Sequence, residues 1–367
     1  MSGNSFKAVK FTRREKDGFG NTVRKRVEAY LKEHNKERTG DYRIWIKVIV
    51  LPLLYLVPFA LLFTPIGTSN LLVFYGLWVI MGIGIAGCGL GIMHDAVHGA
   101  LSANKTANRI VGMVLNLAGG HVMNWRIQHN VLHHSYTNID GYDEDIDPAG
   151  VMRFSPHQPH KKIYKYQIYY AWFLYGLMTF SWATWKDFLQ LRRYREKGLI
   201  KTQGSTFTVE LLKTIGNKII YYSIFIVLPL IFIDVAWFHI PIAWFVMHFV
   251  AGLILACIFQ PAHVMPTSEY PLPDKENNID GDRDVYQILT TTNFAPKNRI
   301  LSWYVGGLNY QIEHHLFPTM CHVHHRDISP IVQKTAEEFG LPYHSEPTFF
   351  GALKKHAQIL NKFGKEA

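Results

Sequence analysis

Long apolar runs alternate with charged blocks along this chain, and four of the runs are long enough to cross a lipid bilayer. A helix needs about 20 residues to cross the hydrocarbon core. Apolar runs of this length between polar segments are typical of an all-α integral membrane protein. The predicted spans are residues 44–64, 71–93, 215–233 and 241–259.

The distribution of basic residues predicts how these spans are oriented. The short turns after the first and third spans contain no Lys or Arg, whereas 13 of the 38 Lys and Arg residues lie before position 48. The positive-inside rule then puts both termini and the long middle segment in the cytoplasm, so that the spans form two hairpins. We predict a basic N-terminal segment (1–43), a membrane domain (44–345) and a C-terminal cytoplasmic tail (346–367).

Two further apolar stretches, residues 109–125 and 164–185, are interrupted by Gly, Asn or Lys and flanked by charges. Helices that lie in the membrane interface, or that are partly buried in the protein, fit them better than spans do. One crossing by each would also preserve the overall topology. Residues 269–284 are strongly polar and predict an exposed loop.

Charge and cysteine content narrow the class of protein. The formal net charge is +10. Because the basic segment leads directly into the first span, it indicates anchoring at anionic lipid rather than nucleic-acid binding. The three cysteines are far apart and form no CxxC pair, so no disulfide framework is expected.

Three histidine clusters follow the spans. In HDAVH, His94 and His98 are one helical turn apart and can share a metal. In HNVLHH, His129 and His133 repeat that spacing while His134 points elsewhere. QIEHH supplies His314 and His315 with Gln311 at the first position, and His263 lies at the end of the fourth span, on the same predicted side.

The number of histidines indicates two metal ions. A mononuclear zinc site needs three or four protein ligands, whereas eight candidate imidazoles suggest a cytoplasmic helical cap that holds a di-metal site. Imidazole suits several metals, but zinc does not change oxidation state, so an oxidase would use iron. An intramembrane zinc protease would account only for HDAVH, and a metal transporter would carry histidines inside its spans.

Acidic residues near these motifs are expected to accept hydrogen bonds from the ligating histidines or to form ion pairs. The remaining histidines are interpreted as packing residues (His121, His239 and His248) or as surface residues and neighbours of the site (His322, His324 and His325). The acidic candidates are Asp95, Asp143, Asp147 and Glu313, together with Asp140, Glu144 and Asp145 of the same loop.

The motifs HDxxH, HxxxHH and QIEHHLFP, in this order, resemble the membrane fatty acid desaturases over nearly the whole chain. Gln311 is typical of the front-end branch, which desaturates on the carboxyl side of a chain. The resemblance implies two irons, O2 as co-substrate and a fatty acyl substrate in or near membrane lipid. It implies as ligands the eight histidines, with Gln311 in contact directly or through water.

The resemblance also implies an electron donor. The sequence has no HPGG haem motif, so the expected donor is a separate ferredoxin or cytochrome b5 steered to the basic cytoplasmic face. Several aromatic residues are candidates to line an acyl tunnel or to pack in the core. They are Trp125, Phe154, Trp172, Trp182 and Trp303. The acyl carrier is open between coenzyme A, phospholipid and acyl carrier protein, and a di-iron hydroxylase is the alternative activity.

Overall fold

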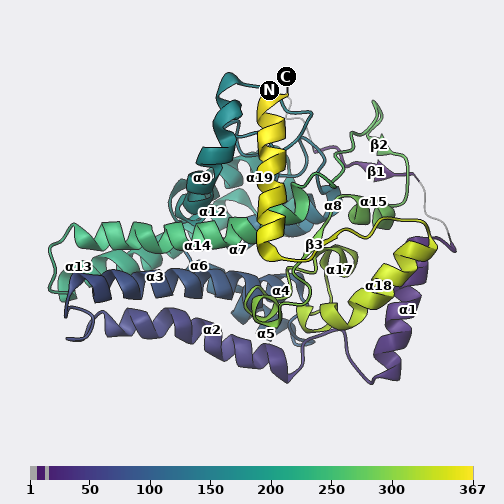
Figure 1. The fold of residues 1–367 in the computed structure, drawn as a ribbon. Helices are drawn as coiled ribbons and strands as arrows, with labels where there is room; N and C mark the ends of the chain where they lie inside the picture. The colour runs from purple at the N-terminus through teal and green to yellow at the C-terminus, as the bar shows by residue number, and fades with distance from the viewer. Residues whose placement is uncertain (1–5, 13–15, 367) are drawn as a thin grey trace.

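The computed structural model describes residues 6–12 and 16–366, and its helices form a long arm and a broader cap (Figure 1). Of the helices within these ranges, four are long and apolar enough to cross a membrane: Tyr42–Leu61, Leu71–His98, Phe207–Phe232 and His239–His263. They match the four runs predicted from sequence to within a few residues at most ends. Neither of the two interrupted apolar stretches is among them.

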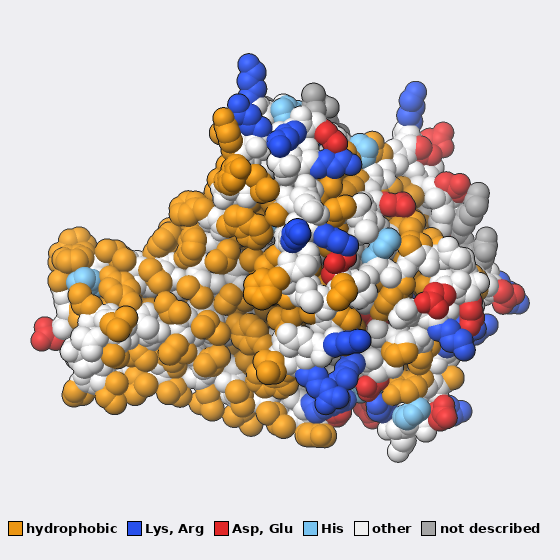
Figure 2. Space-filling model, viewed as in Figure 1, with side chains coloured by type: hydrophobic (Ala, Val, Ile, Leu, Met, Phe, Trp, Pro, Cys, Tyr) orange, Lys and Arg blue, Asp and Glu red, His pale blue; other side chains and the backbone are white. Residues whose placement is uncertain are grey.

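The arm contains α2 (Tyr42–Leu61), α3 (Leu71–Cys88), α12 (Phe207–Tyr222), α13 (Leu228–Phe232) and α14 (His239–His263). Helix α3 packs along both α2 and α14. Glycine permits this approach, since a Cβ atom on Gly82 would lie 2.5 Å from the Met247 carbonyl oxygen. Apolar side chains cover the outside of the arm, while charged side chains gather on the cap (Figure 2).

The cap is built from shorter helices around the inner ends of the arm. Two pairs of parallel two-residue strands, β1 with β2 and β3 with β4, tie distant segments together. The helices are α1 (Phe19–Glu33), α4 (His94–His98), α5 (Lys105–Gly112), α6 (Val114–Leu117), α7 (Val122–Arg126), α8 (His134–Tyr136), α9 (Gln167–Ser181), α10 (Asp187–Glu196), α11 (Leu199–Thr202), α15 (Arg283–Leu289), α16 (Arg299–Tyr304), α17 (Gln311–Leu316), α18 (His325–Glu338) and α19 (Phe349–Lys365). The strands are β1 (Lys10–Phe11), β2 (Asn278–Ile279), β3 (Asn293–Phe294) and β4 (Ser345–Glu346).

Short turns of other helix types connect several of these elements. Two of the π-helical turns, η1 (Gly89–Met93) and η2 (Ile127–His133), precede or contain the first two histidine motifs. Single π-turns inside α-helices occur frequently at functional sites. The others are the π-helical η4 (Trp182–Lys186) and η5 (Ser223–Val227) and the 3-10 turns η3 (Lys162–Tyr166) and η6 (His322–His324).

The two terminal segments of the described chain are docked on the cap. Helix α1 packs on α18, and Arg24 forms an ion pair with Asp284 at 2.5 Å. Residues 346–367 were expected as a tail, but α19 packs against α9 and the end of α14. Residues 1–5, 13–15 and 367 lie outside the described part, so the prediction for the N-terminal segment is only partly addressed.

Candidate metal centre

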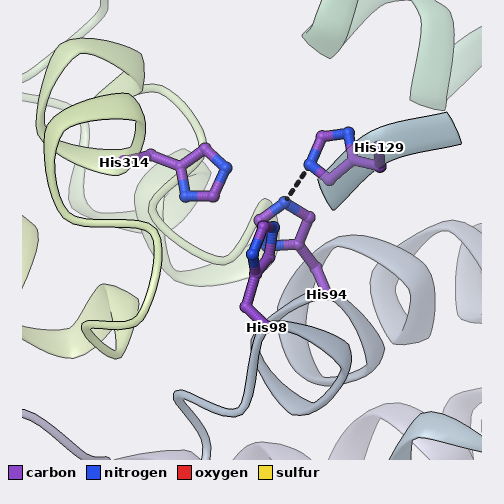
Figure 3. A group of neighbouring side chains, drawn as sticks. All are labelled: His94, His98, His129 and His314. Carbon is purple, nitrogen blue, oxygen red and sulfur yellow. Dashed lines mark hydrogen bonds between the residues drawn. The ribbon is translucent and has the colours of Figure 1, made fainter. Parts of the chain in front are cut away.

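The histidine motifs converge where the inner ends of the arm meet the cap. Three elements distant in sequence supply the first group: α4 carries two of its histidines, η2 one and α17 one. Their side chains point toward one another (Figure 3), and one ring nitrogen from each lies within 4.8 Å of the others. The members of this first group are His94, His98, His129 and His314.

A second group, His133, His263 and His315, lies beside the first and meets the same 4.8 Å criterion. It draws on η2, the end of α14 and α17. His134 lies between the groups, since its ring centroid is 4.8 Å from that of His98 and 4.4 Å from that of His315. The structure therefore brings together all eight histidines singled out in the sequence.

Hydrogen bonds to Nδ1 orient all three rings of the second group. His133 donates to Asp143 at 3.1 Å, His263 to the Thr290 carbonyl oxygen at 3.3 Å and His315 to Gln287 Oε1 at 2.7 Å. A proton held on Nδ1 leaves the Nε2 lone pair free for a metal. The Nε2 atoms of these three rings are buried and have no hydrogen-bond partner among the described residues.

The first group also offers free nitrogen atoms. Nε2 of His98 and Nε2 of His314 are buried without a hydrogen-bond partner in the described chain. His129 Nε2 lies 3.0 Å from His94 Nε2 and 3.2 Å from His134 Nε2. Buried polar atoms are nearly always satisfied, so convergent orphaned imidazole nitrogens fit bound metal.

Local electrostatics keep most of these imidazoles neutral, which is the form that binds metal. Burial and neighbouring imidazoles hold the pKa values of His134, His314 and His315 well below the usual range. At His133, burial opposes protonation, but Asp143 and Asp145 outweigh it and raise the pKa to about 9. Metal binding at His133 therefore displaces a proton that the carboxylates favour.

A cavity opens beside both groups, and we call it the acyl cavity. Its wall includes His129 from the first group and His263 from the second. Trp125, Trp182 and Phe259 provide apolar surface, and the Trp125 ring lies 4.5 Å from that of His129. A mostly apolar cavity with a few polar groups is the usual form of a site for an apolar ligand.

Similarity to known proteins agrees with this geometry. The family model for fatty acid desaturases matches residues 68–347. The chain belongs to the fatty acid desaturase family. It is 34% identical to the sn-1 linoleoyl-lipid 6-desaturase of Synechocystis sp. over 97% of this chain and 98% of that protein. It is also 34% identical to the acyl-lipid (8-3)-desaturase of Physcomitrium patens, over 95% of this chain and 72% of that protein.

The expected activity is thereby confirmed: the protein is an oxidoreductase that desaturates fatty acyl chains. The resemblance to the front-end branch is confirmed as well, since the relatives include 6-desaturases and (8-3)-desaturases. A hydroxylase is not favoured.

The acidic residues of the desaturase divide into those that reach the histidines and those that do not. Asp143 accepts from His133, and Asp145 Oδ2 lies 3.6 Å from His129 Nδ1. Asp95 Oδ1 is 3.8 Å from His94 Nδ1, while its Oδ2 accepts from His322 at 2.7 Å.

Two acidic residues expected beside histidines have other partners. Asp147 is exposed and accepts from the backbone N–H of Ala149. Glu313 is buried but accepts from Asn293 at 2.8 Å and from Tyr343 at 2.7 Å. In a short helix such as α17, neighbouring residues point in different directions, so Glu313 faces away from His314.

Gln311 and the H-x-H-H cluster also differ from the histidine motifs around them. Gln311 is buried, and its amide nitrogen donates to the Leu308 carbonyl oxygen at 2.7 Å. His322 is buried between Asp95 and Lys47, whose Nζ lies 2.6 Å from His322 Nε2. His325 is buried too, so this cluster is not a surface feature.

The remaining aromatic and histidine predictions separate by location. Of the five candidate aromatics, Trp125 and Trp182 line the acyl cavity. Phe154 and Trp172 pack in a core cluster, and Trp303 is 40% exposed. The three packing histidines have ordinary polar partners: Glu210 for His121, Tyr75 for His239 and Tyr221 for His248.

Sequence reasoning missed Gln287 and Thr290. Both follow the predicted loop at 269–284 and reach the histidines only because α15 folds against α17. Neither residue type carries a motif, and Thr290 contributes only a backbone carbonyl. Their roles had no signal in the sequence.

Proposed function

We propose that this desaturase holds two non-haem irons in the two histidine groups and introduces a cis double bond on the carboxyl side of a lipid-linked acyl chain. The ligands would be the eight histidines, with Gln311 as a candidate for contact through water. The observation that carries the proposal is the set of buried, unpaired Nε2 atoms beside an apolar cavity.

Two irons and O2 supply an oxidant strong enough to remove hydrogen from adjacent unactivated carbons. The overall balance joins the acyl CH2–CH2 unit, O2, two electrons and two protons to give CH=CH and two water molecules. Both electrons come from a separate donor, for which ferredoxin or cytochrome b5 is proposed. The protein's tasks are to hold the metals, orient the chain and exclude water.

Named residues account for these tasks. Trp125, Trp182 and Phe259 form the apolar wall that keeps the chain beside the histidines. Asp143 and Gln287 fix the Nδ1 protons of His133 and His315 and so aim Nε2 at a metal.

We further propose that the arm crosses the membrane as two hairpins, with the cap and both termini in the cytoplasm. Support comes from the distribution of charge along the sequence and from the apolar outside of the arm (Figure 2). The name of the Synechocystis relative supports a lipid-linked chain over a CoA-linked one.

The test is expression in a host that lacks polyunsaturated lipids, fed linoleate and supplied with a compatible donor. Mass spectrometry then reads product mass and double-bond position within each lipid class. We expect loss of two hydrogens, with the new bond between the existing one and the carboxyl group. Addition of oxygen, or a new bond on the methyl side, would contradict the proposal.

A further inference from the structure

Two smaller cavities continue from the acyl cavity into the protein. The second cavity shares Trp125, Gln128 and Trp182 with the acyl cavity and adds Leu115. The third shares Leu115 with the second. The three spaces therefore follow one another, and Leu115 stands where the second meets the third.

The third cavity is apolar. It lies between α2, the end of α3 with η1, and the segment around α6, and its wall includes Cys88, Met93, Val114 and Ala118. Its one hydroxyl, on Tyr55, already donates to the Leu117 carbonyl oxygen at 2.9 Å. A space with no free polar group suits an alkyl chain and disfavours an ester or a charged headgroup.

The third cavity also begins close to the metal centre. Met93 in its wall directly precedes His94 of the first group. Met93, Leu115 and Trp125 pack together in one small apolar cluster. Trp125 in turn contacts His94, with ring centroids 5.6 Å apart. A chain passing the histidines thus meets Leu115 next.

Polar groups that could face a carboxyl end lie toward the acyl cavity. Asp145 in its wall has a side chain that is 24% exposed. In the second cavity, by contrast, the polar groups are partnered: Asp187 with Lys218 at 2.7 Å, and Gln190 with Gln128 at 2.6 Å. This order, polar at one end and apolar at the other, gives the chain a direction.

We propose that the third cavity receives the methyl end of the acyl chain and that Leu115 is a specificity-determining residue, which sets how many carbons fit beyond the new double bond. This inference rests on the proposed function, since it assumes that an acyl chain occupies the acyl cavity. Shortening Leu115 joins the second and third cavities, and enlarging Ala118 fills the third.

The test uses two substrates with the same bonds counted from the carboxyl group, 9,12-octadecadienoate and 9,12-eicosadienoate, fed as an equal mixture. We expect Leu115→Ala to raise the ratio of 20-carbon to 18-carbon product and Ala118→Leu to lower it. One methylene in an apolar pocket is worth about tenfold or more in discrimination, so changes of at least about threefold in each direction are expected. Leu117→Ala is the matched control, because Leu117 lies on the same helix but is 37% exposed.

Equal ratios in wild type, Leu115→Ala and Ala118→Leu would overturn the proposal. A shifted double-bond position would overturn it too, because the third cavity would then hold the carboxyl end. A second measurement needs no turnover: the thermal stabilisation of each variant by lipids that carry the two chains. If the proposed activity fails but Leu115→Ala gains stabilisation by the longer chain and Leu117→Ala does not, the inference stands without it.

Discussion

At the scale of single residues, the partner of each Nδ1 atom decides whether a histidine can bind metal. The loop after the second motif contains two aspartates of similar sequence context, Asp143 and Asp147. Asp143 is buried and accepts from His133, whereas Asp147 is exposed. The pair therefore separates the effect of a hydrogen bond to a ligand from the effect of removing a charge in the loop.

We expect Asp143→Asn to weaken metal binding in the second group, because the amide is a poorer acceptor for the His133 N–H. Loss of such a partner typically costs about 10- to 100-fold in metal affinity. The measurement is iron content after equilibration with a graded series of chelator concentrations.

Asp147→Asn is the control and should follow the wild-type curve. Equal loss of iron in both variants would mean that the charge of the loop, rather than the Asp143 hydrogen bond, supports the site.

The residues that bind could be predicted further than the residues that orient them. Spacing identified all eight histidines, because i to i+4 pairs share a helix face whatever the fold. Gln287 and Thr290 come from a distant segment, and their contacts depend on how α15 packs against α17. The amide of Gln311, placed by the motif among the ligands, donates to Leu308 because α17 begins there.

At the scale of elements, the apolar runs predicted the four long helices, since length and hydropathy determine them locally. The π-turns η1 and η2 were not predictable, because one extra residue in a helical turn leaves the apolar pattern almost unchanged. Helix α19 was missed as a docked element. Its anchor, His356, looks like an ordinary polar residue in the sequence but is fully buried.

His356 makes the docking of α19 sensitive to acid. Its Nδ1 donates to the Val264 carbonyl oxygen at 2.8 Å, and its Nε2 accepts from Tyr175 at 2.6 Å. Burial lowers the pKa of His356 from 6.5 to about 4. Because the folded pKa lies below the unfolded one, this contribution to stability is complete above about pH 6.5 and is lost as the pH falls through about 4.

We expect the amide hydrogens of α19 to lose protection from exchange between pH 6.5 and 4, once rates are corrected for intrinsic pH dependence. A shift of this size corresponds to a loss on the order of 3 kcal/mol at the acid limit. His356→Gln does not titrate, so its α19 protection should change little over the same range. Equal acid sensitivity in that variant would assign the effect to other groups.

At the scale of the whole molecule, the charge distribution along the chain predicts which side each end of the arm faces. Ser69 and Asp234 are exposed in the two turns at the outer end of the arm, and Lys275 is exposed in a loop of the cap. We expect a membrane-impermeant maleimide to label Ser69→Cys and Asp234→Cys in intact cells. Lys275→Cys should be labelled only after permeabilisation.

The native cysteines provide a low background, since Cys88 and Cys321 are buried and Cys257 is only partly exposed. Labelling of Lys275→Cys in intact cells, with protection of the two turns, would reverse the proposed orientation. Labelling of one turn alone would break the two-hairpin arrangement.

Metal removal should affect the cap far more than the arm. The histidines of both groups come from α4, η2, α14 and α17, so bound metal cross-links segments that are otherwise joined by packing alone. Ligand present at about 1,000 times its dissociation constant stabilises a folded state by about 4 kcal/mol. We expect chelation to lower the melting temperature by several degrees and to expose the amides of α4, η2 and α17 to hydrogen exchange. The outer halves of α3 and α14 pack on each other without histidine ligands and should keep their protection, so a uniform loss along both helices would count against a metal centre confined to the inner end of the arm.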